Sequence, residues 1–150
     1  MTTHLILGPN GSGKTRRLQQ LIAQAAADPA TTTWVIDPRG ELTAADRHTT
    51  SDGAEQLLAD LLAEVDKRHA RPSDHQPTQA EPRIRLLVDE AEQLLRRAPL
   101  AEQLYRLTVT GRSAGVDTVL AAATTRLDVW PLALRDHYFP ENTETLPPRR

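Results

Sequence analysis

The stretch GPNGSGKT, Gly8–Thr15, directly follows the apolar run HLIL near the start of the chain. It matches the pattern G-x-x-x-x-G-K-[ST], in which backbone N–H groups surround the phosphates of a nucleotide. This pattern requires a strand before it and a helix after it. HLIL is typical of a short strand, and apolar side chains recur at helical spacing from Lys14 to Ala27. The stretch therefore predicts a strand–loop–helix unit that binds ATP, with the helix N-terminus adding partial positive charge.

Individual residues of this loop have predicted roles in binding the nucleotide and its magnesium ion. Lys14 is expected to reach the β- and γ-phosphates and so to act in catalysis, and the Thr15 hydroxyl is expected to ligate Mg²⁺. The alternative is an ordinary glycine turn, which the surrounding strand and helix disfavour. The residues predicted to contact the nucleotide are Gly8, Pro9, Asn10, Gly11, Ser12, Gly13, Lys14, Thr15 and Arg16.

A second motif, LLVDE, is an apolar strand that ends in Asp89 and Glu90. An aspartate at the end of a strand beside the phosphate loop holds Mg²⁺, and a following glutamate can orient or deprotonate the attacking water. The alternative is that both acids only favour the N-terminus of the helix that follows. A glutamate in this place favours hydrolysis over phosphate transfer to a metabolite, because a kinase must exclude the water that this carboxylate recruits.

Apolar runs alternate with amphipathic stretches along the chain, which is typical of an α/β domain. The prediction is a three-layer P-loop NTPase fold, with a mostly parallel sheet of about four to five strands flanked by helices. Residues 1–139 are predicted to form the ATPase core, and residues 140–150 an extended or disordered tail too short for a further strand with its turn. The connector Ala70–Arg83 is expected to be the most mobile loop. The expected strands are His4–Leu7, Thr32–Asp37, Ile84–Asp89 and Asp117–Thr124, and the expected helices begin at Lys14, Ala54, Glu90, Pro99 and Pro131.

Composition limits the remaining function classes. The 150 residues include no cysteine, which excludes a disulfide framework and a thiolate metal site. The net charge of −2 is not the strongly basic balance of a general nucleic-acid binder, so any contact with DNA must come from a local patch. The sequence has no apolar run of about 18 residues, so we expect no membrane span and a cytoplasmic location.

Two further stretches, DPRGEL after the second expected strand and GRSAGVDTVLAAATTR around the fourth, resemble motifs of one family. The order of motifs is similar to that of the FtsK/HerA family of DNA-pumping ATPases, which includes the conjugative coupling proteins. The likeness extends from about residue 5 to residue 139. The matching positions are Asp37, Pro38, Gly40 and Leu42, then Arg112, Ala114, Gly115 and Val116, and then Ala123, Thr124 and Arg126.

The resemblance implies ATP hydrolysis coupled to translocation or transfer of double-stranded DNA. It also implies a homo-oligomeric ring, or service as an accessory to a larger motor. Arg112 and Arg126, with Arg106, are candidates to supply a cation to the phosphates of a neighbouring subunit. From the residues alone, Arg112 is explained equally well by its place near a helix end, where the dipole favours a cation. Thr125 stands where the family has a glutamine that senses the γ-phosphate.

Two other functions stay open at this point. The first is an ATP-binding regulatory or accessory subunit with little turnover, which the short Thr125 hydroxyl and the expected lack of a closing strand favour. The second is a small P-loop kinase. A kinase needs an arginine-rich lid, and the segment Pro72–Pro82 has no arginine.

Overall fold

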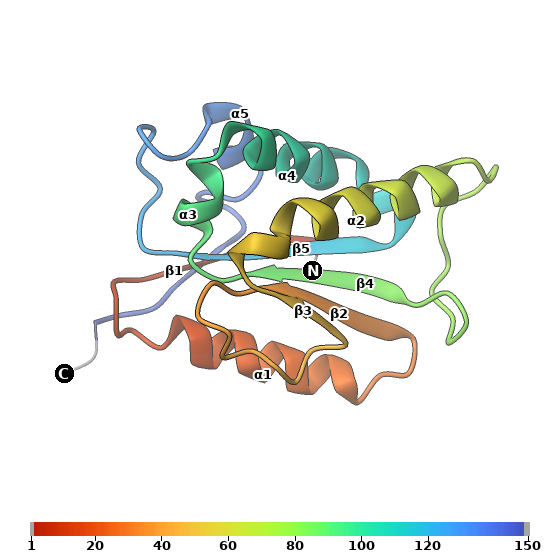
Figure 1. The fold of residues 1–150 in the computed structure, drawn as a ribbon, viewed down its shortest axis with the longest axis horizontal. Coiled ribbons are helices and arrows are strands. Elements are labelled where there is room, and N and C mark those ends of the chain that lie inside the picture. The colour runs from red at the N-terminus through yellow and green to blue at the C-terminus, as the bar shows by residue number, and fades with distance from the viewer. Residues whose placement is uncertain (1, 149–150) are drawn as a thin grey trace.

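The computed structural model describes residues 2–148, in which six strands form one all-parallel sheet of order β3-β2-β4-β5-β1-β6 (Figure 1). The α/β P-loop fold predicted from the sequence is confirmed, with one strand more than the upper expected number. The strands are β1 (Thr3–Leu7), β2 (Thr31–Ile36), β3 (Arg47–Thr49), β4 (Arg83–Val88), β5 (Val116–Ala122) and β6 (Thr143–Thr145). The helices are α1 (Lys14–Ala26), α2 (Ala54–His69), α3 (Ala91–Leu95), α4 (Ala98–Thr110) and α5 (Leu132–Arg135), with short 3₁₀ turns η1 (Ser51–Gly53) and η2 (Arg112–Ala114).

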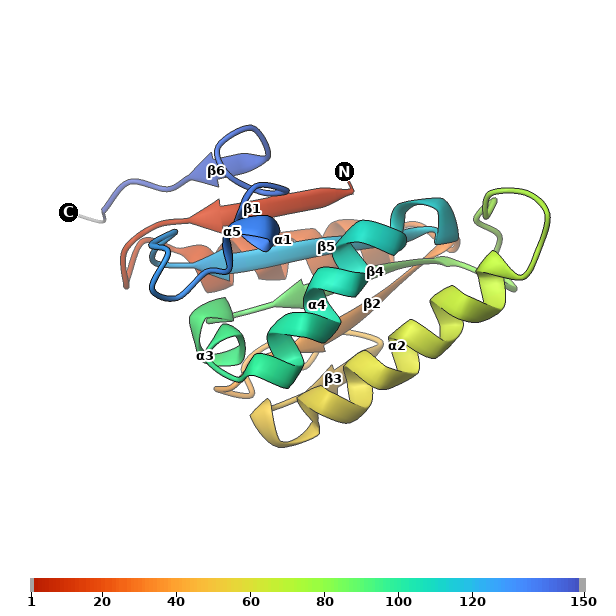
Figure 2. The same ribbon diagram turned by 90° about the horizontal axis from the view of Figure 1, so that it is seen from above.

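Helices cover both faces of the sheet. Helix α1 lies on one face, and α2, α3, α4 and α5 lie on the other (Figures 1 and 2). Because both faces are covered, the central strands carry apolar runs, and every residue of β5 is buried, including the polar Asp117 and Thr118. Two apolar cores result, one around Leu18, Ile22 and Val119 under α1 and the other around Leu58 and Leu104 under α2 and α4.

Strand β3 was not predicted from the sequence. Its residues, RHT, include no apolar side chain, and it lies at the edge of the sheet beside β2. The apolar periodicity that marks a buried strand is therefore missing from this element.

The expectation that no further strand fits after Phe139 is wrong. Strand β6 pairs in parallel with β1, and the Leu146 N–H donates to Leu7 O at 2.7 Å (Figure 2). The sequence argument assumed that the last eleven residues would have to form a strand and then a turn that leads the chain back. In the structure the chain runs from α5 directly to the free edge of β1, where a strand of three residues is enough to pair. Arg149 and Arg150, at the end of the predicted tail, lie outside the described residues.

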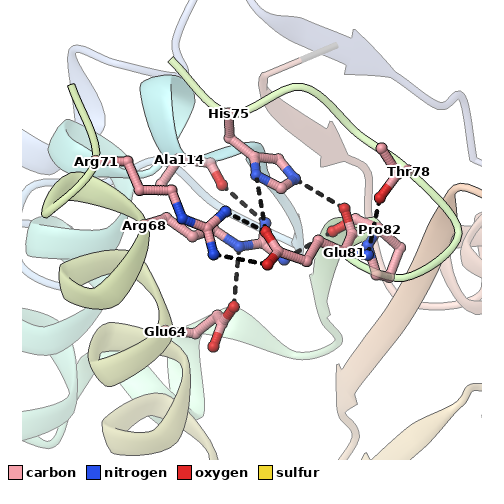
Figure 3. Close-up of polar contacts among 8 residues, drawn as sticks. All are labelled: Glu64, Arg68, Arg71, His75, Thr78, Glu81, Pro82 and Ala114. Carbon is pink, nitrogen blue, oxygen red and sulfur yellow. Dashed lines mark hydrogen bonds and ion pairs between the residues drawn. The ribbon is translucent and has the colours of Figure 1, made fainter. Parts of the chain in front are cut away.

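The connector after α2 is held at several points (Figure 3). The buried Arg68 side chain donates to Ala114 O and to Pro82 O, both at 2.8 Å. His75 donates its backbone N–H to Ser113 O at 2.9 Å, and Arg71 pairs with Glu81. These contacts fix the connector against η2, at the end of the sheet where β4 and β5 begin. Within residues 2–148, no helix is both long and apolar enough to cross a membrane.

Candidate nucleotide-binding site

The phosphate loop runs from the end of β1 to the start of α1 and lies at the carboxyl ends of the parallel strands. Gly13 precedes the helix with φ of 97°, a left-handed conformation that favours glycine. Gly8 is required for space, because a Cβ there would lie 2.5 Å from Ser12 Oγ and 3.0 Å from Leu146 O. The close packing at Gly8 therefore links the loop to the residue that follows β6.

Lys14 lies over this loop. Its Nζ donates to Gly8 O at 2.5 Å and to Pro9 O at 3.0 Å. Partial burial lowers the pKa of Lys14, while the carboxylates of Glu92, Asp89 and Glu90 act in the opposite direction. The ammonium has a third N–H, which is the donor it can offer to a phosphate oxygen.

Thr15 and Asp89 meet at the base of the loop. The Thr15 hydroxyl donates to Asp89 Oδ2 at 2.8 Å, and Asp89 Oδ1 accepts the N–H of Glu90 at 2.9 Å. Burial raises the pKa of Asp89, and the hydrogen bonds from Thr15 and Glu90 partly offset this effect. A hydroxyl and a carboxylate this close form the hard oxygen donor set that Mg²⁺ prefers, so these two side chains fit the ion that the phosphate loop implies.

Glu90 directly follows Asp89 and has left-handed backbone angles, with φ of 49° and ψ of 51°. Its Oε1 lies 2.8 Å from Arg39 Nε, and its Oε2 accepts a hydrogen bond from Gln93 Nε2 at 2.6 Å. A non-glycine residue in this region is uncommon, and such residues occur preferentially at active sites.

One pocket of about 290 Å³ joins most of these groups. The structure thus brings together Lys14, Thr15, Arg16, Asp89 and Glu90, residues to which the sequence analysis gave roles in binding or catalysis. A more apolar hollow of about 170 Å³ shares Asp89 and Glu90 and extends toward Ile36 and Leu100. The larger pocket is lined by Asn10, Gly11, Gly13, Lys14, Thr15, Arg16, Arg39, Glu41, Asp89 and Glu90.

Six predicted residues are not part of this lining, namely Gly8, Pro9 and Ser12 within the phosphate loop and Thr125, Arg126 and Arg112 outside it. Thr125 follows β5, and its carbonyl accepts Arg135 Nε at 2.8 Å. Arg126 is exposed and pairs with Asp128 at 2.6 Å. Arg112 is exposed in η2 at the start of β5, whereas Ala122 O, at the end of β5, accepts the Gly8 N–H. The seven residues of β5 separate Arg112 from the loop by about 23 Å, so Arg112 could meet phosphates only on another subunit.

Arg39 is a pocket residue to which the sequence analysis gave no role. The buried Asp37 accepts the N–H groups of Arg39 at 3.0 Å and Leu42 at 2.7 Å, which shapes DPRGEL into a tight turn. That turn follows β2 at the same edge as the phosphate loop. A cation in a turn after a parallel strand was the available signal.

Glu92 was also missed. Its Oε2 accepts the Ala123 N–H at 2.9 Å and so connects α3 to the end of β5. Among charged groups, Glu92 acts most strongly to raise the pKa of Lys14. An acid in the first turn of the helix after LLVDE was the signal for it.

No protein-family model and no curated protein matches the sequence. Solved structures do match it. A structure described as an ATPase has a TM-score of 0.75 at 18% identity, covering 99% of this chain and 66% of that one. The cytoplasmic domain of EssC has a TM-score of 0.75 at 18% identity, covering 99% of this chain and 33% of that one. The pCW3 conjugation coupling protein TcpA, solved in monomer form with ATPγS, has a TM-score of 0.70 at 18% identity, covering 91% and 46%.

At these identities the likeness shows a shared fold. The chain spans about two thirds of the first of these structures and less than half of the other two. The fold is that of a P-loop ATPase core. That a conjugation coupling protein is among the similar structures agrees with the resemblance to FtsK/HerA-type ATPases.

Proposed function

We propose that this chain is a Mg²⁺-dependent ATPase core of the FtsK/HerA type, whose hydrolysis is coupled to DNA translocation or transfer. One observation carries the proposal. The Thr15 hydroxyl and the Asp89 carboxylate are 2.8 Å apart in a pocket that Lys14 and Glu90 also line. Phosphoryl transfer to water needs a cation that binds the phosphates, oxygen ligands for Mg²⁺ and a carboxylate that acts as a base. All three are present in this pocket.

In this mechanism the backbone of the phosphate loop and Lys14 hold the β- and γ-phosphates. Mg²⁺, held by Thr15 and Asp89, would neutralise negative charge on the phosphates. Glu90 accepts a proton from the attacking water while an oxygen–phosphorus bond forms and the bond between the β–γ bridging oxygen and the γ-phosphorus breaks. The products are ADP and inorganic phosphate, and the proton leaves Glu90 after release.

The DNA and the ring are inferred from the resemblance of the sequence motifs to the FtsK/HerA family, and the neighbouring structures support a role in a conjugation or secretion motor. TcpA is a conjugation coupling protein, and EccC is a Type VII secretion ATPase whose cytoplasmic domain is similar in fold to this chain. We infer a cytoplasmic motor core that acts as a homo-oligomer or as an accessory to a larger motor, with double-stranded DNA as its substrate. Arg112 and Arg126 are exposed, as residues that serve a neighbour's phosphates must be.

The experiment is an ATPase assay with and without double-stranded DNA on the wild type and on Glu90→Gln. We expect DNA-stimulated turnover in the wild type and a loss of at least about a hundredfold in the variant, the usual contribution of a general base. Glu55→Gln, an exposed glutamate in the first turn of α2, is the control. Wild-type turnover that DNA leaves unchanged would contradict the DNA-motor part of the proposal.

Mixing two inactive variants tests the ring. Arg112→Ala keeps Glu90, and Glu90→Gln keeps Arg112, so a mixed ring regains complete sites only if Arg112 acts on a neighbour. Random mixing in equal amounts would restore about a quarter of the wild-type sites. If activity stays absent in the mixture, the role of Arg112 in trans is contradicted. Mass measurement with ATP and Mg²⁺ provides the oligomeric state.

A second candidate function is an ATP-binding regulatory subunit with little turnover. It is favoured by the contacts of Glu90, whose oxygens face Arg39 and Gln93. Tight ATP binding without turnover in either the wild type or Glu90→Gln would support it. A kinase has less support, because the connector after α2 is fixed at η2, at the opposite end of β5 from the phosphate loop, where it cannot serve as a lid.

A further inference from the structure

The Glu90 carboxylate is held from two sides. Arg39 Nε lies 2.8 Å from Oε1, and Gln93 Nε2 donates to Oε2 at 2.6 Å. A general base must offer an oxygen to the water that it activates. In this arrangement each oxygen already contacts a side chain of the protein. These contacts set the direction of the carboxylate and compete with the water for its lone pairs, so Glu90 is a better base once a partner has moved away.

Arg39 is the partner that is able to move. Its backbone is fixed, because Asp37 accepts its N–H at 3.0 Å and Gly40 closes the turn with φ of 70°. Its side chain is 63% exposed. An ion pair so open to water contributes little stability, and its guanidinium exchanges partners readily.

A γ-phosphate would be the stronger partner. Arg39 lines the same pocket as Lys14 and Arg16, and its charge lowers the pKa of Lys14, which places both cations within electrostatic reach of each other. A bound triphosphate brings several negative charges to this pocket. Guanidinium binds phosphate oxygens with two parallel hydrogen bonds, a geometry that a single Nε contact to a carboxylate does not use.

We propose that Arg39 is a positioning residue that responds to the γ-phosphate. Without a γ-phosphate it holds Glu90, and with ATP it pairs with the γ-phosphate and releases Glu90 to the attacking water. ADP lacks the group that draws Arg39 away, so Glu90 returns to it after hydrolysis. This inference rests on the proposed function, because it requires the pocket to bind a nucleoside triphosphate.

The test compares affinities for ATPγS and ADP, both with Mg²⁺, by calorimetry on the wild type, Arg39→Ala and Arg39→Lys. Because only ATPγS carries the third phosphate, we expect Arg39→Ala to weaken its binding about tenfold, the size of one charge-assisted hydrogen bond, and to change ADP binding less than about twofold. Arg39→Lys keeps the cation and is expected to recover part of the preference for ATPγS. Calorimetry measures nucleotide binding directly, so the result does not depend on how fast the protein hydrolyses ATP.

Arg97→Ala is the matched control. Arg97 lines the neighbouring hollow, and among residues 2–148 its side chain donates a hydrogen bond only to Ser51 O, at 3.5 Å, so its loss should leave both affinities unchanged. If Arg39→Ala leaves the ratio of the two affinities at the wild-type value, the inference is overturned while the proposed function stands. If the wild type binds neither nucleotide, the proposed function fails and the inference fails with it. A thermal melt of each variant confirms that it is folded.

Discussion

The Thr15 hydroxyl donates a hydrogen bond to Asp89 Oδ2 at 2.8 Å, across a sequence separation of 74 residues. The contact joins the first turn of α1 to the end of β4, and these elements come from different parts of the chain. Asp89 is almost completely buried, and burial raises the pKa of its carboxyl group. A buried aspartate with a hydroxyl partner beside a phosphate loop is therefore the most direct structural sign of a magnesium site in this protein.

Asp89→Asn should remove the effect of Mg²⁺ on nucleotide binding. The amide preserves the shape of the side chain but removes the negative charge, so we expect turnover to fall at least about a hundredfold and Mg²⁺ to change ATPγS affinity less than about twofold. Titrating ATPγS with and without Mg²⁺ measures the effect. Asp74→Asn, in the exposed part of the connector, is the control. A variant that keeps the full magnesium dependence would rule out Asp89 as a metal-binding residue.

Lys14→Ala should abolish tight ATP binding. Lys14 Nζ lies over the loop carbonyls of Gly8 and Pro9. Lys14 is the only cationic residue in Gly8–Thr15, so its loss leaves this loop without a positively charged side chain. We expect ATPγS affinity to fall about 10- to 100-fold, the range for one or two charge-assisted hydrogen bonds. Lys67→Ala is the matched control, because Lys67 is the second of the two lysines in the sequence and is exposed near the end of α2. Equal losses in both variants would show a general charge effect.

The parts of the site that sequence could predict are those encoded by neighbouring residues. GPNGSGKT specifies its own loop, and LLVDE combines an apolar run with two acids, so Lys14, Thr15, Asp89 and Glu90 were placed at one edge by the rule that parallel strands end together. Arg39 was not assigned because its contact with Glu90 depends on how the turn after β2 faces α3. That relationship exists only in the folded sheet.

The fold was predicted to a similar extent. Buried strands such as β4 and β5 carry long apolar runs, and these runs predict strands directly. Strands β3 and β6 are edge strands of three residues, RHT and TET, whose side chains are polar. Their pairing with β2 and β1 is determined by tertiary structure, and no periodicity in three residues can reveal it.

Tyr138→Phe should lower stability and change its dependence on alkaline pH. The Tyr138 hydroxyl lies 2.7 Å from both Thr108 Oγ1 and Thr118 Oγ1, and complete burial raises the pKa of Tyr138 to about 12. Loss of this buried hydroxyl should cost about 1–3 kcal/mol at neutral pH.

The pH dependence of Tyr138 has a definite sign. Above pH 10 the unfolded chain releases the phenol proton while the folded chain keeps it, so stability falls as pH rises from 10 toward about 12. Phenylalanine removes this contribution. Urea unfolding at pH 8, 10 and 11 should therefore show a smaller alkaline loss in Tyr138→Phe than in the wild type. Parallel curves for the two proteins would contradict the buried, hydrogen-bonded phenol.

Ending the chain after Pro140 should destabilise the sheet and weaken the phosphate loop. Strand β6 covers the edge of β1, Arg17 of α1 pairs with Glu144 at 2.9 Å, and Leu146 O lies beside Gly8. Removing these contacts leaves β1 as an exposed edge, which favours aggregation. We expect Tm to fall by several degrees, about 2–4 °C for each kcal/mol lost in a domain of this size, and ATPγS affinity to decrease.

Measuring Tm and ATPγS affinity of Glu144→Ala separates the contribution of strand β6 from that of its ion pair with Arg17. The Arg17–Glu144 pair is partly exposed, so its loss alone should cost at most about 1 kcal/mol. Glu141→Ala, an exposed residue before β6, is the control and should match the wild type. If the shortened chain keeps the wild-type Tm and ATPγS affinity, β6 does not support the nucleotide site. If it loses affinity for ATPγS at a temperature where it remains folded, the strand that closes the sheet also holds the phosphate loop in its binding conformation.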